Sequence, residues 1–179
     1  MLGVASVYQM IANGGIGYRP RIVKGTRNND NSIMEYEPQP QERKLSVTTC
    51  NILSNLLLSV VESGTGKRAG IPGVEICGKT GTANLPDFIH GGYHSDKFLS
   101  SFCGYFPRVS PRILVMISVE DPKGDAKWGG STAAPIFAEV SQRIINLPDP
   151  VKRITRDWAR RNEYSIMPDV VGVHRFEAI

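Results

Sequence analysis

Residues 73–84 read GVEICGKTGTAN and contain two overlapping motifs. The pattern G-x-x-x-x-G-K-T over residues 73–80 has the spacing of a P-loop, a turn whose backbone amides hold phosphate. The pattern K-T-G-T over residues 79–82 suits a β-strand that offers an ammonium group and hydroxyls to an anionic ligand. The two motifs imply unrelated chemistry and different local folds, so the neighbouring residues must decide between them.

The flanking sequence argues against the P-loop. A P-loop needs a buried strand before its glycines and a helix that begins at its Lys-Thr pair. The segment before Gly73, GTGKRAGIP, has no apolar run, and residues 74–77, Val-Glu-Ile-Cys, are strand-like rather than turn-like. After the Lys-Thr pair, Gly81 and Pro86 oppose a helix. We therefore expect a strand over Val74–Thr82.

Apolar periodicity predicts the elements around this strand. Three helices are expected: the first ends at Gly14-Gly15, the second is capped by Thr48 or Thr49 and ends at Gly64, and the third is capped by Ser131 or Thr132. Their apolar stripes are Val4, Val7, Tyr8 and Ile11; Ile52, Leu53, Leu56, Leu57, Val60 and Val61; and Ile136, Phe137, Val140, Ile144 and Ile145. The other expected strands are Arg21–Lys24 and Ser32–Tyr36, joined as a hairpin through Asn28–Asn31, and Phe98–Phe106 and Ile113–Val119.

Clustered strands with helices at the ends predict an α+β domain with an antiparallel sheet. Within it, Val74–Thr82 is expected to run antiparallel to Phe98–Phe106, with Ile113–Val119 in the same sheet. The third of these runs is almost wholly apolar at first, as expected of a strand that is covered on both faces.

The composition excludes several classes of protein. The chain has 179 residues, 41% of them hydrophobic and 21% charged, which is typical of a globular protein. A net charge of +4 without a basic face argues against a nucleic-acid partner. No run of about eighteen apolar residues could span a bilayer, and no signal sequence follows Met1. These observations leave two interpretations, a cytoplasmic protein or one whose targeting segment lies outside this chain.

The cysteines and histidines predict neither a disulfide framework nor a metal site. Cys50, Cys77 and Cys103 are widely spaced and are expected to be small buried hydrophobic residues. Symmetric pairing of the two strands would place Cys77 nearly opposite Cys103, but neighbouring strands rarely bring Cβ atoms to about 3.8 Å, so free thiols are expected. His90 and His94 flank two glycines without a third ligand nearby, which predicts a loop pair without metal.

The candidate ligand site lies on the predicted strand itself. Lys79 supplies a positive charge, and Thr80 and Thr82 supply hydroxyls, a set that suits a free carboxylate. Gly78 and Gly81 lack side chains, so a ligand backbone could lie close to the strand. Strict alternation places Lys79 on the face opposite the two threonines, and the sequence does not establish whether its long side chain reaches over the edge. Two later residues, Asp121 and Trp128, either line the ligand site beside this strand or close turns.

An ordered series of motifs resembles the C-terminal part of a penicillin-binding transpeptidase, most closely the class B type. The series begins with YQMIANGG and P-RIVK and continues with VVESGTGKRAGIPGVEI, GKTGTAN, KFLSSFCGYFP, RILVMISVEDP and WGGSTAAPIFAEV. It covers about residues 1–147. The resemblance implies the penicillin-recognising fold, incomplete at its N-terminus, and peptidoglycan cross-linking through a serine acyl-enzyme without a metal or organic cofactor.

The resemblance also implies a role for each residue of the K-T-G-T strand. Lys79 would be catalytic, by organising the electrostatics and proton transfers of the cleft. Thr80 and Thr82 would hold the carboxylate of the substrate or of a β-lactam, and Gly81 would keep the strand open. The backbone N–H of Thr82 would be one donor of the oxyanion hole. The implied partners are peptidoglycan stem peptides, β-lactam antibiotics and proteins of the division or elongation machinery.

The nucleophile that the family uses has no counterpart in this sequence. No serine is followed three residues later by Lys, and no Ser-x-Asn occurs. In the family both motifs precede the first of these helices, so the chain resembles one wall of a site without its nucleophile and is not expected to form an acyl-enzyme alone. A non-catalytic fragment that binds peptidoglycan or a partner protein is the alternative hypothesis, and a P-loop nucleotide-binding protein is the third.

The C-terminal residues differ in character from the rest. Residues 148–163 are basic and are predicted to be a linker, and residues 164–179, YSIMPDVVGVHRFEAI, resemble the start of a PASTA domain. The resemblance as a whole implies a location on the extracytoplasmic face of the bacterial inner membrane. The implied anchor is an N-terminal helix that is absent from this chain.

Overall fold

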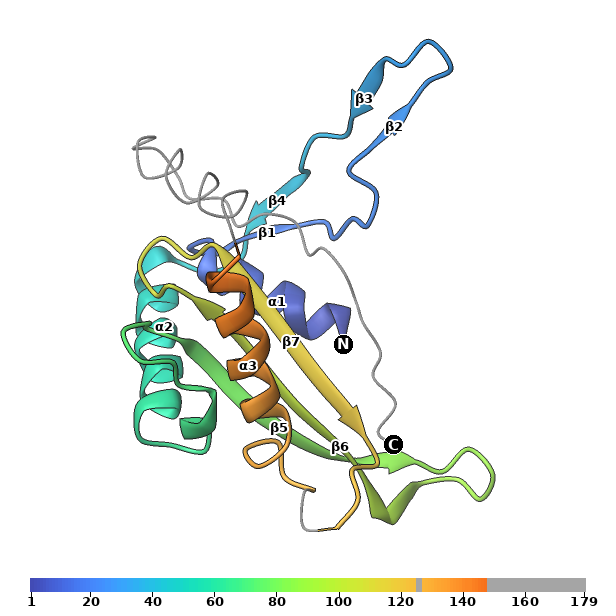
Figure 1. Ribbon diagram of the computed structural model, residues 1–179, viewed down its shortest axis with the longest axis vertical. Helices are drawn as coiled ribbons and strands as arrows, with labels where there is room; N and C mark the ends of the chain where they lie inside the picture. The colour runs from blue at the N-terminus through green and yellow to red at the C-terminus, as the bar shows by residue number, and fades with distance from the viewer. Residues whose placement is uncertain (125–126, 148–179) are drawn as a thin grey trace.

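The central feature is a three-stranded antiparallel sheet in the order β5-β6-β7 (Figure 1). The computed structural model describes residues 1–124 and 127–147. The strands are β5 (Cys77–Pro86), β6 (Tyr93–Phe106) and β7 (Ile113–Glu120). Their order and direction confirm the sequence prediction, although β5 begins at Cys77 rather than Val74 and β6 is longer at its start. No helix begins at Thr80, so the P-loop interpretation is wrong.

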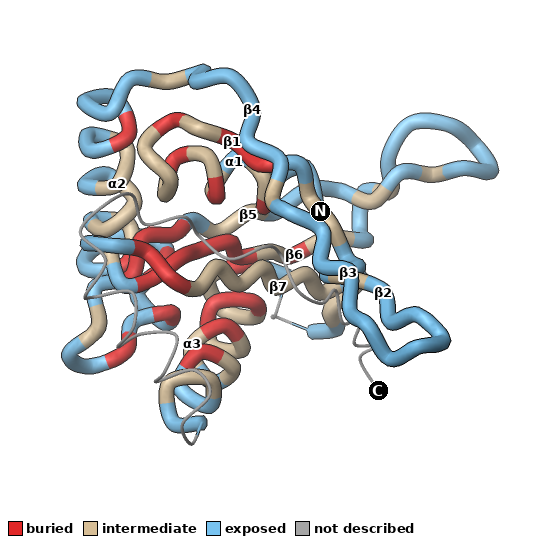
Figure 2. The backbone as a smooth tube through the Cα atoms, turned by 90° about the horizontal axis from the view of Figure 1, so that it is seen from above, coloured by how far each residue is buried: buried red, intermediate tan, exposed pale blue. Residues whose placement is uncertain are grey.

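Helices cover both faces of this sheet, which gives a three-layer arrangement (Figure 2). Helices α1 (Leu2–Ala12) and α2 (Val47–Glu62) lie on one face. Helix α3 (Ala133–Ile145) and the short 3-10 helix η1 (Lys67–Ala69) lie on the other. Alternate residues of each strand therefore enter two separate cores. In β7, Ile113, Val115 and Ile117 pack on the α3 side, and Leu114 packs on the other.

The core beneath α3 is built around Phe102 of β6. Its ring lies 4.7 Å from that of Phe137, and both side chains are fully buried. A Cβ atom at Gly78 would lie 2.5 Å from the Phe102 ring, and one at Gly104 would lie 2.9 Å from it. Gly78 was expected to give a ligand close access to the strand. That expectation is wrong, because Gly78 is buried and makes room for Phe102 instead.

The helices follow the predicted periodicity, with corrections at their caps and on their outer faces. Helix α2 is capped by Ser46, whose side chain accepts a hydrogen bond from the Thr49 backbone N–H at 3.0 Å, so the predicted threonine caps are wrong. Thr132 is the N-cap residue of α3, as expected. The predicted stripes are wider than the buried surface. The exposed members are Val4 and Val7 of α1 and Ile52 and Leu56 of α2, while Leu53, Leu57 and Val61 of α2 pack on the cores.

Two small antiparallel pairs precede α2. The predicted hairpin exists, with strands β2 (Gly25–Arg27) and β3 (Ile33–Glu35), so the prediction of its first strand over Arg21–Lys24 is wrong. It projects away from the sheet (Figure 1). At its base, β1 (Ile16–Tyr18) pairs with β4 (Pro40–Arg43). β1 and β4 were not predicted, because neither carries an alternation of apolar residues long enough to indicate a strand.

The cysteines are buried and free, as expected. The strand register places Cys77 opposite Tyr105, and Cys103 opposite Lys79. The expectation that the two cysteines lie nearly opposite one another is therefore wrong by two residues. Burial raises the pKa of Cys77 to about 11 and that of Cys103 to about 12. Both thiols are thus kept in the neutral form at physiological pH.

No helix among the described residues is long and apolar enough to cross a bilayer. The predicted linker over residues 148–163 and the PASTA-like segment over residues 164–179 lie outside the described residues.

Candidate active site

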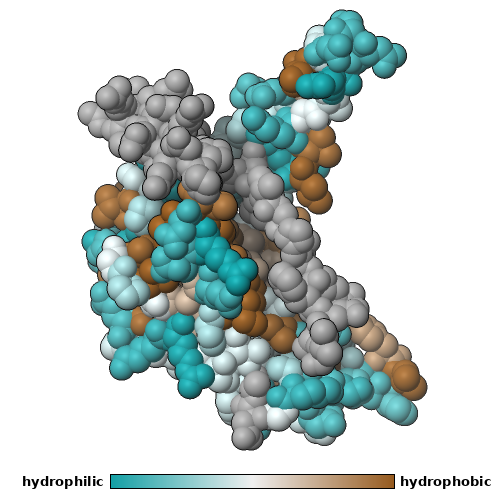
Figure 3. All heavy atoms as spheres, viewed as in Figure 1, coloured by the Kyte–Doolittle hydropathy of each residue, from teal (hydrophilic) through white to brown (hydrophobic). Residues whose placement is uncertain are grey.

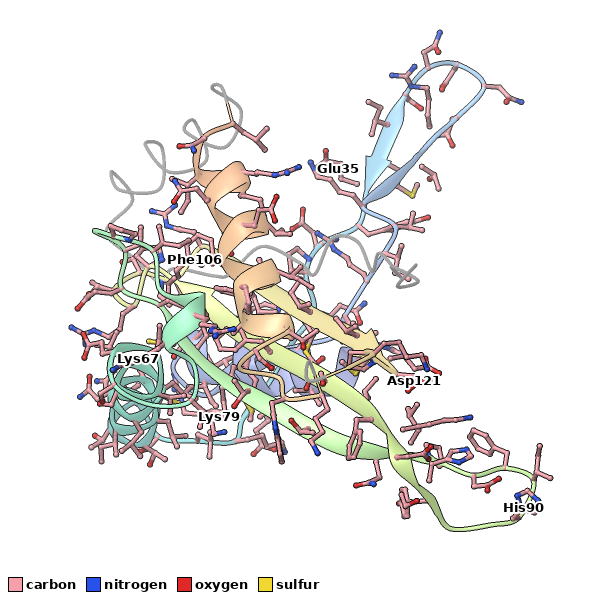
Figure 4. The ribbon with its side chains drawn as sticks, turned by 60° about the horizontal axis from the view of Figure 1, so that its bottom comes forward. Glu35, Lys67, Lys79, His90, Phe106 and Asp121 are labelled. Carbon is pink, nitrogen blue, oxygen red and sulfur yellow. The ribbon has the colours of Figure 1, made fainter. Side chains whose placement is uncertain are left out.

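The candidate site lies on β5, one of the two edge strands of the central three-stranded sheet. In the described part of the chain β5 pairs only with β6, so its other edge is open to a ligand. An open edge can accept an extended peptide through backbone hydrogen bonds, as an additional strand. Lys79 is the third residue of this strand (Figure 4). The K-T-G-T residues that were predicted as a site therefore lie where a peptide can reach them.

The Lys79 side chain crosses from its own face of the sheet to the neighbouring threonine. Its Nζ atom lies 3.1 Å from the Thr80 carbonyl oxygen and 3.2 Å from Thr80 Oγ1. Alternation along the strand places Lys79 on the face opposite Thr80, and the sequence did not establish whether its side chain reaches that threonine. The structure shows that the lysine side chain is long enough to do so. The ammonium group and the Thr80 hydroxyl form one local donor set, which suits an anionic group of a ligand.

A second hydroxyl, from Thr65, joins this set and was not predicted. Thr65 Oγ1 lies 2.9 Å from Thr80 Oγ1. The residue follows the end of α2, where the backbone N–H groups of Gly64 and Gly66 both donate to the carbonyl of Val60. This turn fixes Thr65 beside β5. Its only sequence signal is its place between two glycines, Gly64 and Gly66, in the segment that resembles the transpeptidases.

Thr82 lies two residues along β5 and is held by the loop before α3. Its Oγ1 accepts a hydrogen bond from the Gly129 backbone N–H at 3.2 Å. A Cβ atom at Gly129 would lie 2.6 Å from the Gly81 carbonyl oxygen, so only glycine lets this loop approach the strand. Thr82 as a whole residue is exposed, so a ligand can contact it.

The two other candidate residues, Trp128 and Asp121, lie in different places. Trp128 precedes the loop glycine that contacts Thr82, and it is 58% exposed. Asp121 lies at the far end of β7, away from Lys79 (Figure 4), and its backbone N–H donates to the Phe98 carbonyl at 2.7 Å. Asp121 therefore closes a turn and does not line the site.

The histidine pair lies at the tip of the β5–β6 hairpin. His90 Nδ1 is 2.9 Å from Asp87 Oδ2, and His94 Nδ1 is 3.9 Å from the same oxygen. No cluster of three or more metal-ligating side chains occurs among residues 1–124 and 127–147.

The fold and the strand together define the class of protein. The family model of the penicillin-binding protein transpeptidase domain matches residues 1–142, and the chain belongs to this family. Its match to PbpB, a penicillin-binding protein of Mycolicibacterium smegmatis, is 33% identical over 169 residues. That match covers 87% of this chain and 26% of the relative. Stage V sporulation protein D of Bacillus subtilis is also 33% identical, over 90% of this chain and 26% of its own length.

Solved structures show the same relationship. The apo crystal structure of penicillin-binding protein 3 from Mycobacterium tuberculosis superposes with a TM-score of 0.71 and 30% identity, and covers 95% of this chain and 37% of that one. The same protein complexed with ampicillin gives a TM-score of 0.68 and 34% identity, over 83% of this chain and 36% of that one. The chain spans about a quarter of the length of the two curated relatives, PbpB and Stage V sporulation protein D.

Proposed function

We propose that this chain forms the Lys-Thr-Gly wall of a serine D,D-transpeptidase site, which binds penicillin and cross-links peptidoglycan. The observation that carries the proposal is the donor set on an open strand edge. In it, the Thr80 hydroxyl lies 3.2 Å from the Lys79 ammonium group and 2.9 Å from the Thr65 hydroxyl. Membership of the family and the ampicillin complex of a similar protein support it.

Each residue of the wall has a distinct role in this proposal. The terminal carboxylate of a stem peptide binds the hydroxyls of Thr80 and Thr82, with the Lys79 ammonium group beside it. The scissile carbonyl oxygen accepts a hydrogen bond from the Thr82 backbone N–H, and Gly81 leaves space for the peptide to lie along the strand. Removing one such oxyanion donor costs on the order of 3 kcal/mol in the transition state.

The chemistry requires a nucleophile from another segment, because no Ser-x-x-Lys motif occurs in this sequence. The serine oxygen would attack the penultimate D-Ala carbonyl, and the bond to the terminal D-Ala nitrogen would break as that nitrogen gains a proton. An amine of a neighbouring stem peptide would then displace the serine. The Lys79 ammonium group stabilises the negative charge that develops during both steps. We place this reaction on the extracytoplasmic side of the membrane, with a membrane anchor and division or elongation partners supplied outside this chain.

A non-catalytic binding fragment is the second candidate function, and the missing Ser-x-x-Lys motif favours it for the chain alone. Fluorescent penicillin separates the two. The chain alone should remain unlabelled, and the same residues joined to an upstream segment with Ser-x-x-Lys and Ser-x-Asn should be labelled. Failure of the joined protein to react would contradict the transpeptidase proposal, and labelling of the chain alone would mean that the nucleophile is misplaced.

Two substitutions in the joined protein test the wall itself. Thr82→Val should slow labelling about ten- to a hundredfold, because the hydrogen bond it removes to a charged ligand group is worth roughly 1.5–3 kcal/mol. Thr80→Ser keeps a hydroxyl in place and should have a smaller effect. Equal labelling rates for Thr82→Val and the parent would show that β5 is not the carboxylate-binding wall.

A further inference from the structure

The β5–β6 hairpin ends in an exposed apolar tip that the proposed acyl transfer does not use. Phe88 is 92% exposed, Ile89 is 87% exposed and Tyr93 is 75% exposed. The tip extends beyond the end of the sheet (Figure 1), and hydrophobic atoms lie at this place on the surface (Figure 3). Exposed apolar groups gathered at one point of a surface commonly mark a site of interaction.

Hydrogen bonds give the tip a defined shape. Asp87 Oδ1 accepts from the backbone N–H groups of Ile89 at 2.9 Å and His90 at 3.0 Å. The Asp87 backbone N–H donates to the Gly92 carbonyl at 3.0 Å, and the Gly91 N–H donates to the Asp87 carbonyl at 2.9 Å. Gly91 and Gly92 both have positive φ angles, which glycine adopts without strain. A loop that is already ordered loses little conformational entropy when a ligand binds.

A peptide substrate that binds as proposed would run along β5 towards this tip. The inference therefore rests on the proposed function. With its carboxylate at the hydroxyls of Thr80 and Thr82 and its scissile carbonyl at the Thr82 backbone N–H, a stem peptide runs along β5 towards Pro86. From Thr82 to its last residue, Pro86, β5 covers roughly 13 Å, and Phe88 lies two residues further on, in the turn. The few residues that precede D-Ala-D-Ala in a stem peptide span on the order of 10 Å, and the lactyl group and its sugar follow. The sugar thus arrives near the end of β5.

We propose that Phe88 and Tyr93 at this tip bind the sugar of the glycan strand that carries the donor stem peptide. Aromatic rings offer flat apolar faces to the C–H groups of a sugar ring, and the Tyr93 hydroxyl and the His90 imidazole offer hydrogen-bond partners to sugar hydroxyls.

The charges around the tip favour a sugar over a lipid surface. Asp87 and Asp96 lie close in sequence to Lys97 and to the two histidines, so both signs of charge are present. A segment that binds anionic lipid usually carries a cluster of Lys and Arg instead.

Amide NMR spectra of the full chain test the proposal with two ligands, a stem pentapeptide that ends in D-Ala-D-Ala and the same peptide attached to its disaccharide. The peptide should shift amide signals within residues 79–86. The disaccharide form should also shift those of residues 88–93 and bind about tenfold more tightly. The double substitution Phe88→Ser and Tyr93→Ser should remove this gain and leave peptide binding unchanged. Tyr36→Ser, at an exposed aromatic residue beyond β3, is the matched control and should keep the gain.

The failures of the two proposals are distinguishable. Equal affinity of the parent for both ligands, or a gain that survives the double substitution, would overturn the glycan site and leave the peptide site standing. Absence of shifts within residues 79–86 with either ligand would overturn the proposed function, and the glycan site with it. Binding of the parent to vesicles of anionic phospholipid that is lost in the double variant would assign the tip to a membrane instead.

Discussion

A substitution at Gly78 tests what the missing side chain at this position makes room for. The structure indicates that it makes room for the core and not for a ligand. An alanine Cβ would lie 2.5 Å from Cζ of Phe102 and 2.9 Å from the Cys103 carbonyl oxygen. Carbon atoms pack best at about 3.5–4.0 Å, so the ring would have to move by about 1 Å. It has little room to do so, because Phe102 is fully buried against Phe137.

The expected loss follows from two opposing effects. Overpacking a core costs about 1–3 kcal/mol, and this site belongs at the upper end because backbone as well as side chain is in the way. Replacing Gly by Ala also reduces the entropy of the unfolded chain, which contributes about 0.4–1 kcal/mol in the opposite direction. Gly78→Ala should therefore lower the free energy of unfolding by about 2 kcal/mol.

Urea unfolding followed by circular dichroism measures this change. Gly3→Ala is the matched control, because Gly3 lies within α1 and a Cβ atom there would meet no other atom within 4 Å. This substitution should be neutral or slightly stabilising. Phe102→Leu should restore part of the stability when it is combined with Gly78→Ala. A change below about 0.5 kcal/mol for Gly78→Ala, or strict additivity of the two substitutions, would refute the packing argument.

Three further predictions concern the site, the hairpin tip and the buried thiols. Thr65→Val should slow penicillin labelling of the joined protein about three- to tenfold, because the Thr80 hydroxyl loses a hydrogen bond worth about 1 kcal/mol; an unchanged rate would remove Thr65 from the site. Hydrogen bonds from His90 and Ile89 lower the pKa of Asp87 to about 2, so the carboxylate should stabilise the tip above about pH 4 and lose this effect as the pH falls through 2. A carboxyl NMR titration of Asp87 with a midpoint near pH 4 would contradict this. Burial raises the pKa of Cys103 to about 12, so its contribution to stability should be complete below about pH 8.5 and fall as the pH rises through 12. Mass spectrometry should find little alkylation of Cys103 at pH 8 before unfolding, and rapid modification of the native protein would show that it is accessible.

The sequence predicts the sheet well because its evidence is local. Apolar runs and the residues that interrupt them define β6 and β7, and the strand-like residues 74–77 with the helix-breaking Gly81 and Pro86 favour a strand at β5 over the P-loop. Burial across the sheet is not local. Nothing in residues 77–82 indicates that Gly78 faces Phe102, because that depends on the register between β5 and β6. The same register places Cys77 opposite Tyr105 and not opposite Cys103.

The site follows a similar division. The residue types at Lys79, Thr80 and Thr82 indicate an anion-binding strand without any structure. The reach of Lys79 across the strand depends on its side-chain conformation, and the approach of Thr65 depends on a turn that returns to β5 after α2. Periodicity carries no information on either. The width of an apolar stripe also overestimates burial, as Ile52 and Leu56 show, because it reports chemical character and not the presence of a packing partner.

The open edge of β5 also bears on the solubility of the protein. An unpaired strand edge can accept a strand from another copy as readily as a peptide ligand, and this is a common route to aggregation. A strand irregularity between Asn84 and Pro86, together with the proline itself, blunts the far end of this edge. The stretch from Lys79 to Thr82 cannot be protected in the same way without losing its backbone donors. Ligands that occupy β5 should therefore slow self-association, and concentrated samples should be most stable when the strand is filled.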